Sequence, residues 1–70
     1  MSEPARIDAR GLRCPWPALR LARALRSGLF PIEILADDPA AEREIRALAT
    51  ARGAGIETLE IEGGLAFRIG

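Results

Sequence analysis

The 70-residue chain contains no histidine, no lysine and no tyrosine, and it has a single cysteine. Without histidine or lysine it cannot contain a Ser-His-Asp or Cys-His catalytic arrangement, a Schiff-base lysine or a P-loop lysine. One cysteine cannot form an intramolecular disulfide and, with no histidine beside it, cannot build a zinc site. Very few side chains are therefore able to carry out catalysis, and we expect neither a metal nor another cofactor.

Long apolar runs are also absent. No segment approaches the roughly 20 consecutive apolar residues of a membrane-spanning helix, and Met1–Arg6 lacks the apolar segment of a secretory signal. We therefore expect a cytoplasmic protein with no membrane segment. A chain of this length is predicted to form one domain, residues 1–70, with a thin core, and we expect it to be a monomer.

The ten basic and ten acidic side chains cancel, but they are unevenly distributed. Residues 1–30 carry six arginines and two acids, for a net charge of +4, whereas residues 31–70 have a net charge of −4. A nucleic-acid-binding domain is typically basic overall and offers aromatic side chains for stacking, so no direct nucleic-acid binding is expected. The arginines of residues 1–30 either lie on a solvated face or form a patch that attracts an acidic partner.

The spacing of the apolar residues predicts the order strand, helix, strand, helix, strand, strand. Asp38 followed by Pro39 is a start signal for the second helix. The elements expected before the C-terminal hairpin are residues 5–10, 14–27, 32–37 and 38–52. The predicted fold class is α/β (α+β), a βαβαββ two-layer sandwich in which a four-stranded mixed sheet carries two helices on one face.

The apolar residues of the C-terminal hairpin favour one register. A three-residue loop, Glu62–Gly64, pairs Leu59 with Phe67 and places the apolar residues of both strands on one face. A two-residue turn of the two glycines would set an acidic side chain opposite Phe67. We therefore predict the three-residue loop, which leaves Leu35 and Ile56 on the face away from the helices.

Cys14 is the residue best placed to carry chemistry. A lone cysteine in a small domain is usually a buried apolar residue, but Cys14 immediately precedes the first predicted helix. As the N-cap it would lie in the positive field of the helix dipole, which favours thiolate over thiol, and Arg13 and Arg10 would add positive charge. Pro15 and Pro17 would stiffen the first turn, where backbone N–H groups lack intrahelical partners. The pattern predicts a catalytic Cys14 whose thiolate these four residues support.

The segment Asp8–Pro17, DARGLRCPWP, closely resembles the N-terminal signature of the TusA-like (SirA/YeeD-type) sulfur-carrier family, and residues 36–40, ADDPA, with Glu44 and Ile45 beyond them, resemble its second element. The resemblance covers almost the whole chain and implies the same βαβαββ fold. It also implies a sulfurtransferase in which Cys14 accepts a sulfane sulfur as a persulfide and passes it on. The implied partners are a sulfur-donor protein, either a cysteine desulfurase or a rhodanese-like protein, and a sulfur-acceptor protein.

Trp16 stands between the two prolines, where members of this family often carry an acidic residue. It either packs against Leu19 or the sheet edge, or it is an exposed aromatic anchor of the kind enriched at interface hot spots. Arg20 and Arg23, one and two turns further along the helix, would extend a partner-binding surface around Trp16.

Two other functions fit the same residues. In a protein-binding or regulatory module, Cys14 would be a structural cap, and Cys14→Ser would keep the function because serine is a good N-cap. In a thiol redox sensor, an exposed Cys14 of low pKa would form a sulfenic acid or a mixed disulfide. A thiol pKa near that of free cysteine, roughly 8.5, would favour the binding module.

Overall fold

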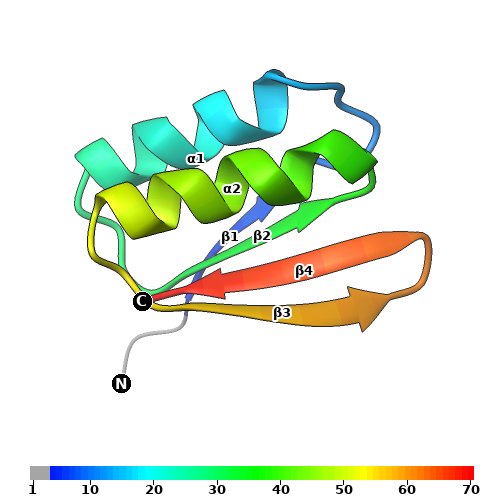
Figure 1. Cartoon of the computed structure of the whole chain (residues 1–70). Coiled ribbons are helices and arrows are strands. Elements are labelled where there is room, and N and C mark those ends of the chain that lie inside the picture. The colour runs from blue at the N-terminus through cyan, green and yellow to red at the C-terminus, as the bar shows by residue number, and fades with distance from the viewer. Residues whose placement is uncertain (1–3) are drawn as a thin grey trace.

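The computed structural model describes residues 4–70. Residues 1–3, which belong to the segment Met1–Arg6 that was expected to lack a secretory signal, lie outside the described residues. Both helices cover one face of a four-stranded sheet (Figure 1). The predicted element order and the two-layer architecture are therefore confirmed. The elements are β1 (Ala5–Asp8), α1 (Trp16–Arg26), β2 (Ile32–Ala36), α2 (Pro39–Ala51), β3 (Ile56–Ile61) and β4 (Gly64–Ile69).

The strands lie in the order β1-β2-β4-β3. β1 and β2 are parallel and are connected through α1, whereas β4 pairs with both β2 and β3 in antiparallel fashion. Because β1 and β2 run in the same direction, their carboxyl ends lie at the same edge of the sheet. The loops that lead from these strands into α1 and α2 therefore meet there.

The helices pack through the apolar faces that the sequence predicts. In α1 the buried residues recur every three or four positions, as does the shorter buried set of α2, which is typical of one helix face turned to a core. No helix of residues 4–70 is long and apolar enough to cross a membrane. The core cluster contains Ala9, Leu21, Ala24, Leu25, Ile32, Ile34, Ala36, Ala41, Ile45, Ala49, Phe67 and Ile69.

The predicted register of the hairpin was wrong. Ile61 pairs with Gly64 across a two-residue turn, Glu62–Gly63, in which Gly63 has a φ of +79°. A side chain at Gly64 would collide with the carbonyl oxygen of Ala36 at the end of β2. Because β4 approaches β2 closely at this point, the position requires glycine, and Gly64 is the first residue of β4 and not part of the turn. The turn follows directly after Ile61, where β3 was predicted to end.

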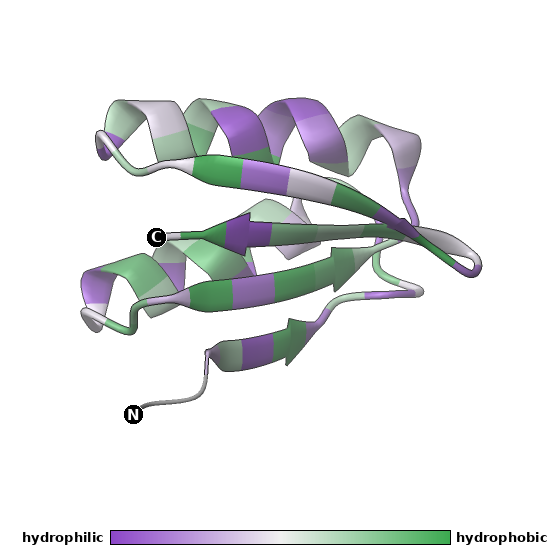
Figure 2. Cartoon of the chain, turned by 90° about the horizontal axis from the view of Figure 1, so that it is seen from below, coloured by the Kyte–Doolittle hydropathy of each residue, from purple (hydrophilic) through white to green (hydrophobic). Residues whose placement is uncertain are grey.

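This shift exchanges the two faces of β3. Ile56, expected on the outer face, lies opposite Ile69 and packs against the core, whereas Leu59 lies on the outer face and is 50% exposed. Leu35 is on the outer face as predicted, yet it is buried, because it lies beside Ala66, which in turn pairs with Leu59. Figure 2, which views the sheet from the side opposite the helices, shows hydrophilic and hydrophobic residues alternating along the strands.

Candidate functional site

Cys14 lies in the loop between β1 and α1, and its side chain is exposed. The N-cap of α1 is Pro15, so the prediction that Cys14 is the N-cap was wrong. The chain turns just before the helix, because the N–H of Trp16 donates to the carbonyl oxygen of Arg13 at 2.9 Å. This turn places Cys14 one residue outside the helix. Pro17 is buried in the first turn of α1.

Two aspartates that follow β2 hold the loop that carries Cys14. Both oxygens of Asp37 accept the N–H of Gly11, each at 3.0 Å. Asp38 accepts the N–H of Cys14 at 2.7 Å with one oxygen and the N–H of Ala40 at 3.0 Å with the other, so it caps α2 as predicted. Hydrogen bonds to a carboxylate are stronger than those between neutral groups. The backbone of Cys14 is therefore fixed to the start of α2.

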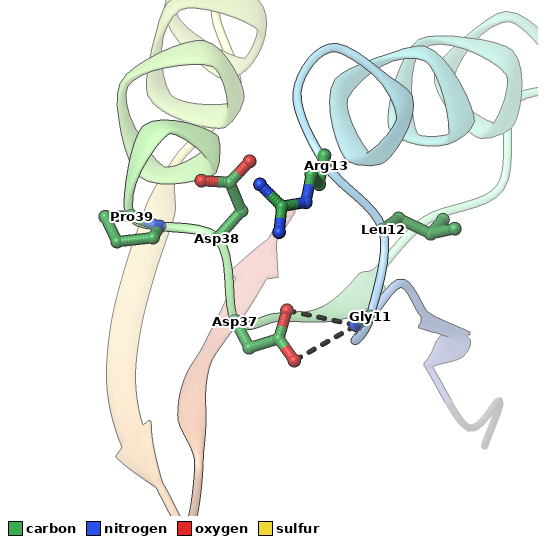
Figure 3. A pocket seen from close by; sticks show the side chains of 6 residues that line it. All are labelled: Gly11, Leu12, Arg13, Asp37, Asp38 and Pro39. Atoms are coloured by element: carbon green, nitrogen blue, oxygen red, sulfur yellow. Dashed lines mark hydrogen bonds between the residues drawn. The ribbon is translucent and has the colours of Figure 1, made fainter.

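The loop segment Gly11–Arg13 and the turn Asp37–Pro39 together line a surface hollow of about 350 Å³. The side chain of Arg13 extends across it toward Asp38 (Figure 3). The hydrogen bond from the N–H of Cys14, the bond from Ala40 and the charge of Arg13 together lower the pKa of Asp38. Asp38 is therefore a carboxylate at neutral pH, and the positive charge of Arg13 is directed at it.

The sulfur of Cys14 faces a carboxylate of α2. Its thiol donates a hydrogen bond to Oε1 of Glu44, with Sγ 3.8 Å from the oxygen. Partial desolvation of the sulfur raises the pKa of Cys14, and the negative charges of Glu44 and Asp38 and this hydrogen bond raise it further. The sequence predicted a lowered pKa, which was wrong because the sulfur is partly desolvated and because the charged groups that act on it are carboxylates and not guanidinium groups.

Arg10 is paired with Asp8 instead of supporting the thiolate as predicted. Its Nε donates to one oxygen of Asp8 at 2.9 Å and its terminal nitrogen donates to the other at 2.8 Å. These bonds hold the pKa of Asp8 at about 2. The guanidinium of Arg10 is therefore occupied by a neighbouring carboxylate two residues away.

The outward side of α1 next to Cys14 is aromatic and basic. Trp16 is 59% exposed and Leu19 is also exposed, which favours the exposed anchor over the alternative in which Trp16 packs against Leu19 or the sheet edge. Arg20 and Arg23 line a hollow beside Ile7 of β1. Residues 16, 19, 20 and 23 share one helix face by their spacing. We call this set of four residues the basic face of α1.

From the sequence, Asp37 and Glu44 were placed only in the segment that resembles the family's second element, with no role at the site, and Asp38 was predicted only to cap the second helix. A signal was present, because an acidic pair directly after β2 lies at the same sheet edge as the loop after β1 once the two strands are parallel. Within residues 4–70, no cluster of histidine, cysteine, aspartate and glutamate side chains is arranged to hold a metal ion.

Most of this chain is similar to known proteins. The family model described as "Sulfurtransferase TusA" matches residues 5–69. A protein of Archaeoglobus fulgidus named "Putative sulfur carrier protein" is 43% identical over 58 residues, which cover 80% of this chain and 73% of that protein. The crystal structure of a SirA-like protein from Desulfitobacterium hafniense matches with a TM-score of 0.79 and 26% identity over 93% of this chain and 95% of that chain.

Proposed function

Because the chain belongs to the sulfurtransferase TusA family, we propose that it is a sulfur carrier that holds a sulfane sulfur as a persulfide on Cys14 and delivers it to a partner protein. The observation that carries this proposal is the position of Cys14. It is the only cysteine of the chain, the residue is exposed, and its backbone is held by Asp38. A carrier needs a sulfur that a donor and an acceptor reach in turn, and an exposed cysteine on a fixed loop meets that need.

Loading is an exchange at sulfur. The Cys14 thiol releases its proton to solvent, and the thiolate attacks the outer sulfur of a donor persulfide. A new S–S bond forms at Sγ, the S–S bond of the donor breaks, and the donor leaves as a thiolate. The donor is a cysteine desulfurase or a rhodanese-like protein.

Delivery repeats the exchange with the roles reversed. An acceptor thiolate attacks the outer sulfur of the Cys14 persulfide, and Cys14 leaves as the thiolate. The chain has no second cysteine that could displace the outer sulfur. The sulfur therefore stays on Cys14 until an acceptor docks.

The two alternative functions gain no support from the site. A structural cap requires Cys14 at the N-cap of α1, and Pro15 occupies that position. The pKa of Cys14 is raised, first by desolvation and then by nearby carboxylates, which disfavours the thiolate that a redox sensor and a sulfur carrier both use, so the pKa does not favour the redox sensor over the carrier.

Intact-mass measurement after incubation with a persulfide donor tests the proposal. We expect the wild-type chain to gain the mass of one sulfur atom and to lose it on treatment with a reducing thiol. Cys14→Ser is the matched control, because it replaces only the sulfur, and it should gain nothing. A wild-type chain that stays unmodified with both a loaded desulfurase and a loaded rhodanese would contradict the proposal.

A further inference from the structure

The structure points to a role for Glu44, which sulfur exchange itself does not require. We propose that Glu44 determines which donors react with Cys14: its carboxylate retains the thiol proton, and donors that place a positive group against this carboxylate are therefore favoured. This inference rests on the proposed function for its biological meaning. Its physical content, a preference of Cys14 for cationic reaction partners, stands independently of sulfur transfer.

The first support is the contact itself. Glu44 Oε1 lies 3.8 Å from Sγ of Cys14, and the hydrogen bond of the Cys14 N–H to Asp38 keeps the loop next to α2. Glu44 is exposed, so a docking partner can reach it. It forms no ion pair within residues 4–70, whereas Glu42 of the same helix pairs with Arg46 at 3.2 Å. The Glu44 carboxylate is therefore available to an external cation.

The second support is the sign of the surrounding charges. The charged groups that act on the sulfur are Glu44 of α2 and Asp38 of the β2–α2 turn, and both are negative. The nearby cations act elsewhere, since Arg13 acts on Asp38 and Arg10 is paired with Asp8. An approaching cation would thus meet the carboxylate of Glu44, which has no ion-pair partner within residues 4–70, beside Sγ.

The hydrogen bond to Glu44 and the charge of Glu44 both favour the protonated thiol of Cys14. A cation placed on the carboxylate cancels that charge and makes the thiolate easier to form at the moment a donor docks.

The pH profile of alkylation by neutral iodoacetamide tests the first half of the proposal. Glu44→Gln removes one negative charge about 4 Å from the sulfur. Its rate of alkylation at pH 7 should therefore be about fivefold higher than that of wild type, and the midpoint of its pH–rate profile should move to lower pH. Glu42→Gln removes the same charge from the same helix without touching the sulfur, and it should follow the wild type. Identical profiles for wild type and Glu44→Gln would overturn the proposal.

Exchange with small charged disulfides tests the second half. The Cys14 thiolate attacks one sulfur of the reagent, forms a mixed disulfide and releases the other half as a thiolate, which takes a proton from water. We expect wild type to react faster with cationic cystamine than with anionic 3,3′-dithiodipropionate. This preference should fall about fivefold in Glu44→Gln and stay unchanged in Glu42→Gln.

An unchanged preference in Glu44→Gln would contradict the role of Glu44. Neither reagent assay needs a sulfur-donor protein. A failure of the donor-loading experiment would therefore leave this inference standing, and a failure of the reagent assays would leave the persulfide proposal standing.

Discussion

Asp38 uses its two carboxylate oxygens for two different elements. One oxygen caps α2 through Ala40, and the other holds the N–H of Cys14. Both hydrogen bonds are strongest when the carboxyl group of Asp38 is ionised, and they lower the pKa of Asp38 in the folded protein. A group with a lowered folded pKa stabilises the fold above its unfolded pKa, about 3.9 for aspartate, and this stabilisation is lost as the pH falls through the folded value.

Asp38→Asn should therefore lower the thermal unfolding midpoint most at neutral pH. Asparagine keeps one acceptor oxygen but has no charge, so the difference from wild type should shrink as the pH is lowered from 6 toward the acid side of the Asp38 titration. Thermal denaturation followed by circular dichroism measures both midpoints. A difference that stays constant over this range would show that the charge of Asp38 does not stabilise the loop.

At this scale the sequence predicts local features and misses distant ones. The exposed Cys14 next to a helix start and the cap at Asp38 follow from neighbouring residues, and both are present. The sign of the pKa shift of Cys14 was missed, because desolvation of the sulfur arises only from the tertiary fold and because the carboxylates that add to the shift lie 24 and 30 residues away along the chain. Only the parallel pairing of β1 and β2 brings them to the sulfur.

The β3–β4 hairpin shows what determines strand register in this fold. Ile56 packs against the core, whereas Leu59 is half exposed on the other face. Ile56→Ala should therefore cost about 1–2 kcal/mol, since it removes a partly buried side chain, and Leu59→Ala should cost about 0.5 kcal/mol or less.

Urea denaturation of the two variants measures these free energies of unfolding. The reverse order, with Leu59→Ala the more damaging, would indicate the register with the three-residue loop.

The two helices were predictable because each repeats its apolar residues over three turns, so a shift by one residue is evident. The hairpin has no such redundancy, and a single backbone approach between Gly64 and Ala36 determines its turn.

At the scale of the whole molecule, Cys14 lies at a boundary between charges of opposite sign. Arg20 and Arg23 of the basic face of α1 line a hollow beside β1, whereas the carboxylates of Asp38 and Glu44 contact Cys14 from the β2–α2 turn and from α2. The uneven charge along the sequence predicted a basic patch, but it did not place the acidic groups beside the same sulfur. We propose that the donor presents acidic groups to α1 and a positive group to Glu44.

Charge reversal of Arg20 and Arg23 to glutamate tests this arrangement. Loading from a protein donor should slow by about tenfold and lose much of its dependence on salt, because steering by opposite charges weakens. The reaction with neutral iodoacetamide should not change. Arg52→Glu, at the far end of α2, is the control. Equal loading rates for the double variant and the control would contradict a docking role for the basic face.

Cold cyanolysis of the loaded, purified chain tests most directly whether Cys14 holds the sulfur. Cyanide takes the outer sulfur of a persulfide as thiocyanate and leaves the cysteine as a thiol, so the thiocyanate formed counts the transferable sulfur. We predict one equivalent of thiocyanate per wild-type chain and none from Cys14→Ser treated in the same way. Wild-type protein that releases no thiocyanate, or a serine variant that releases as much as wild type, would contradict the account.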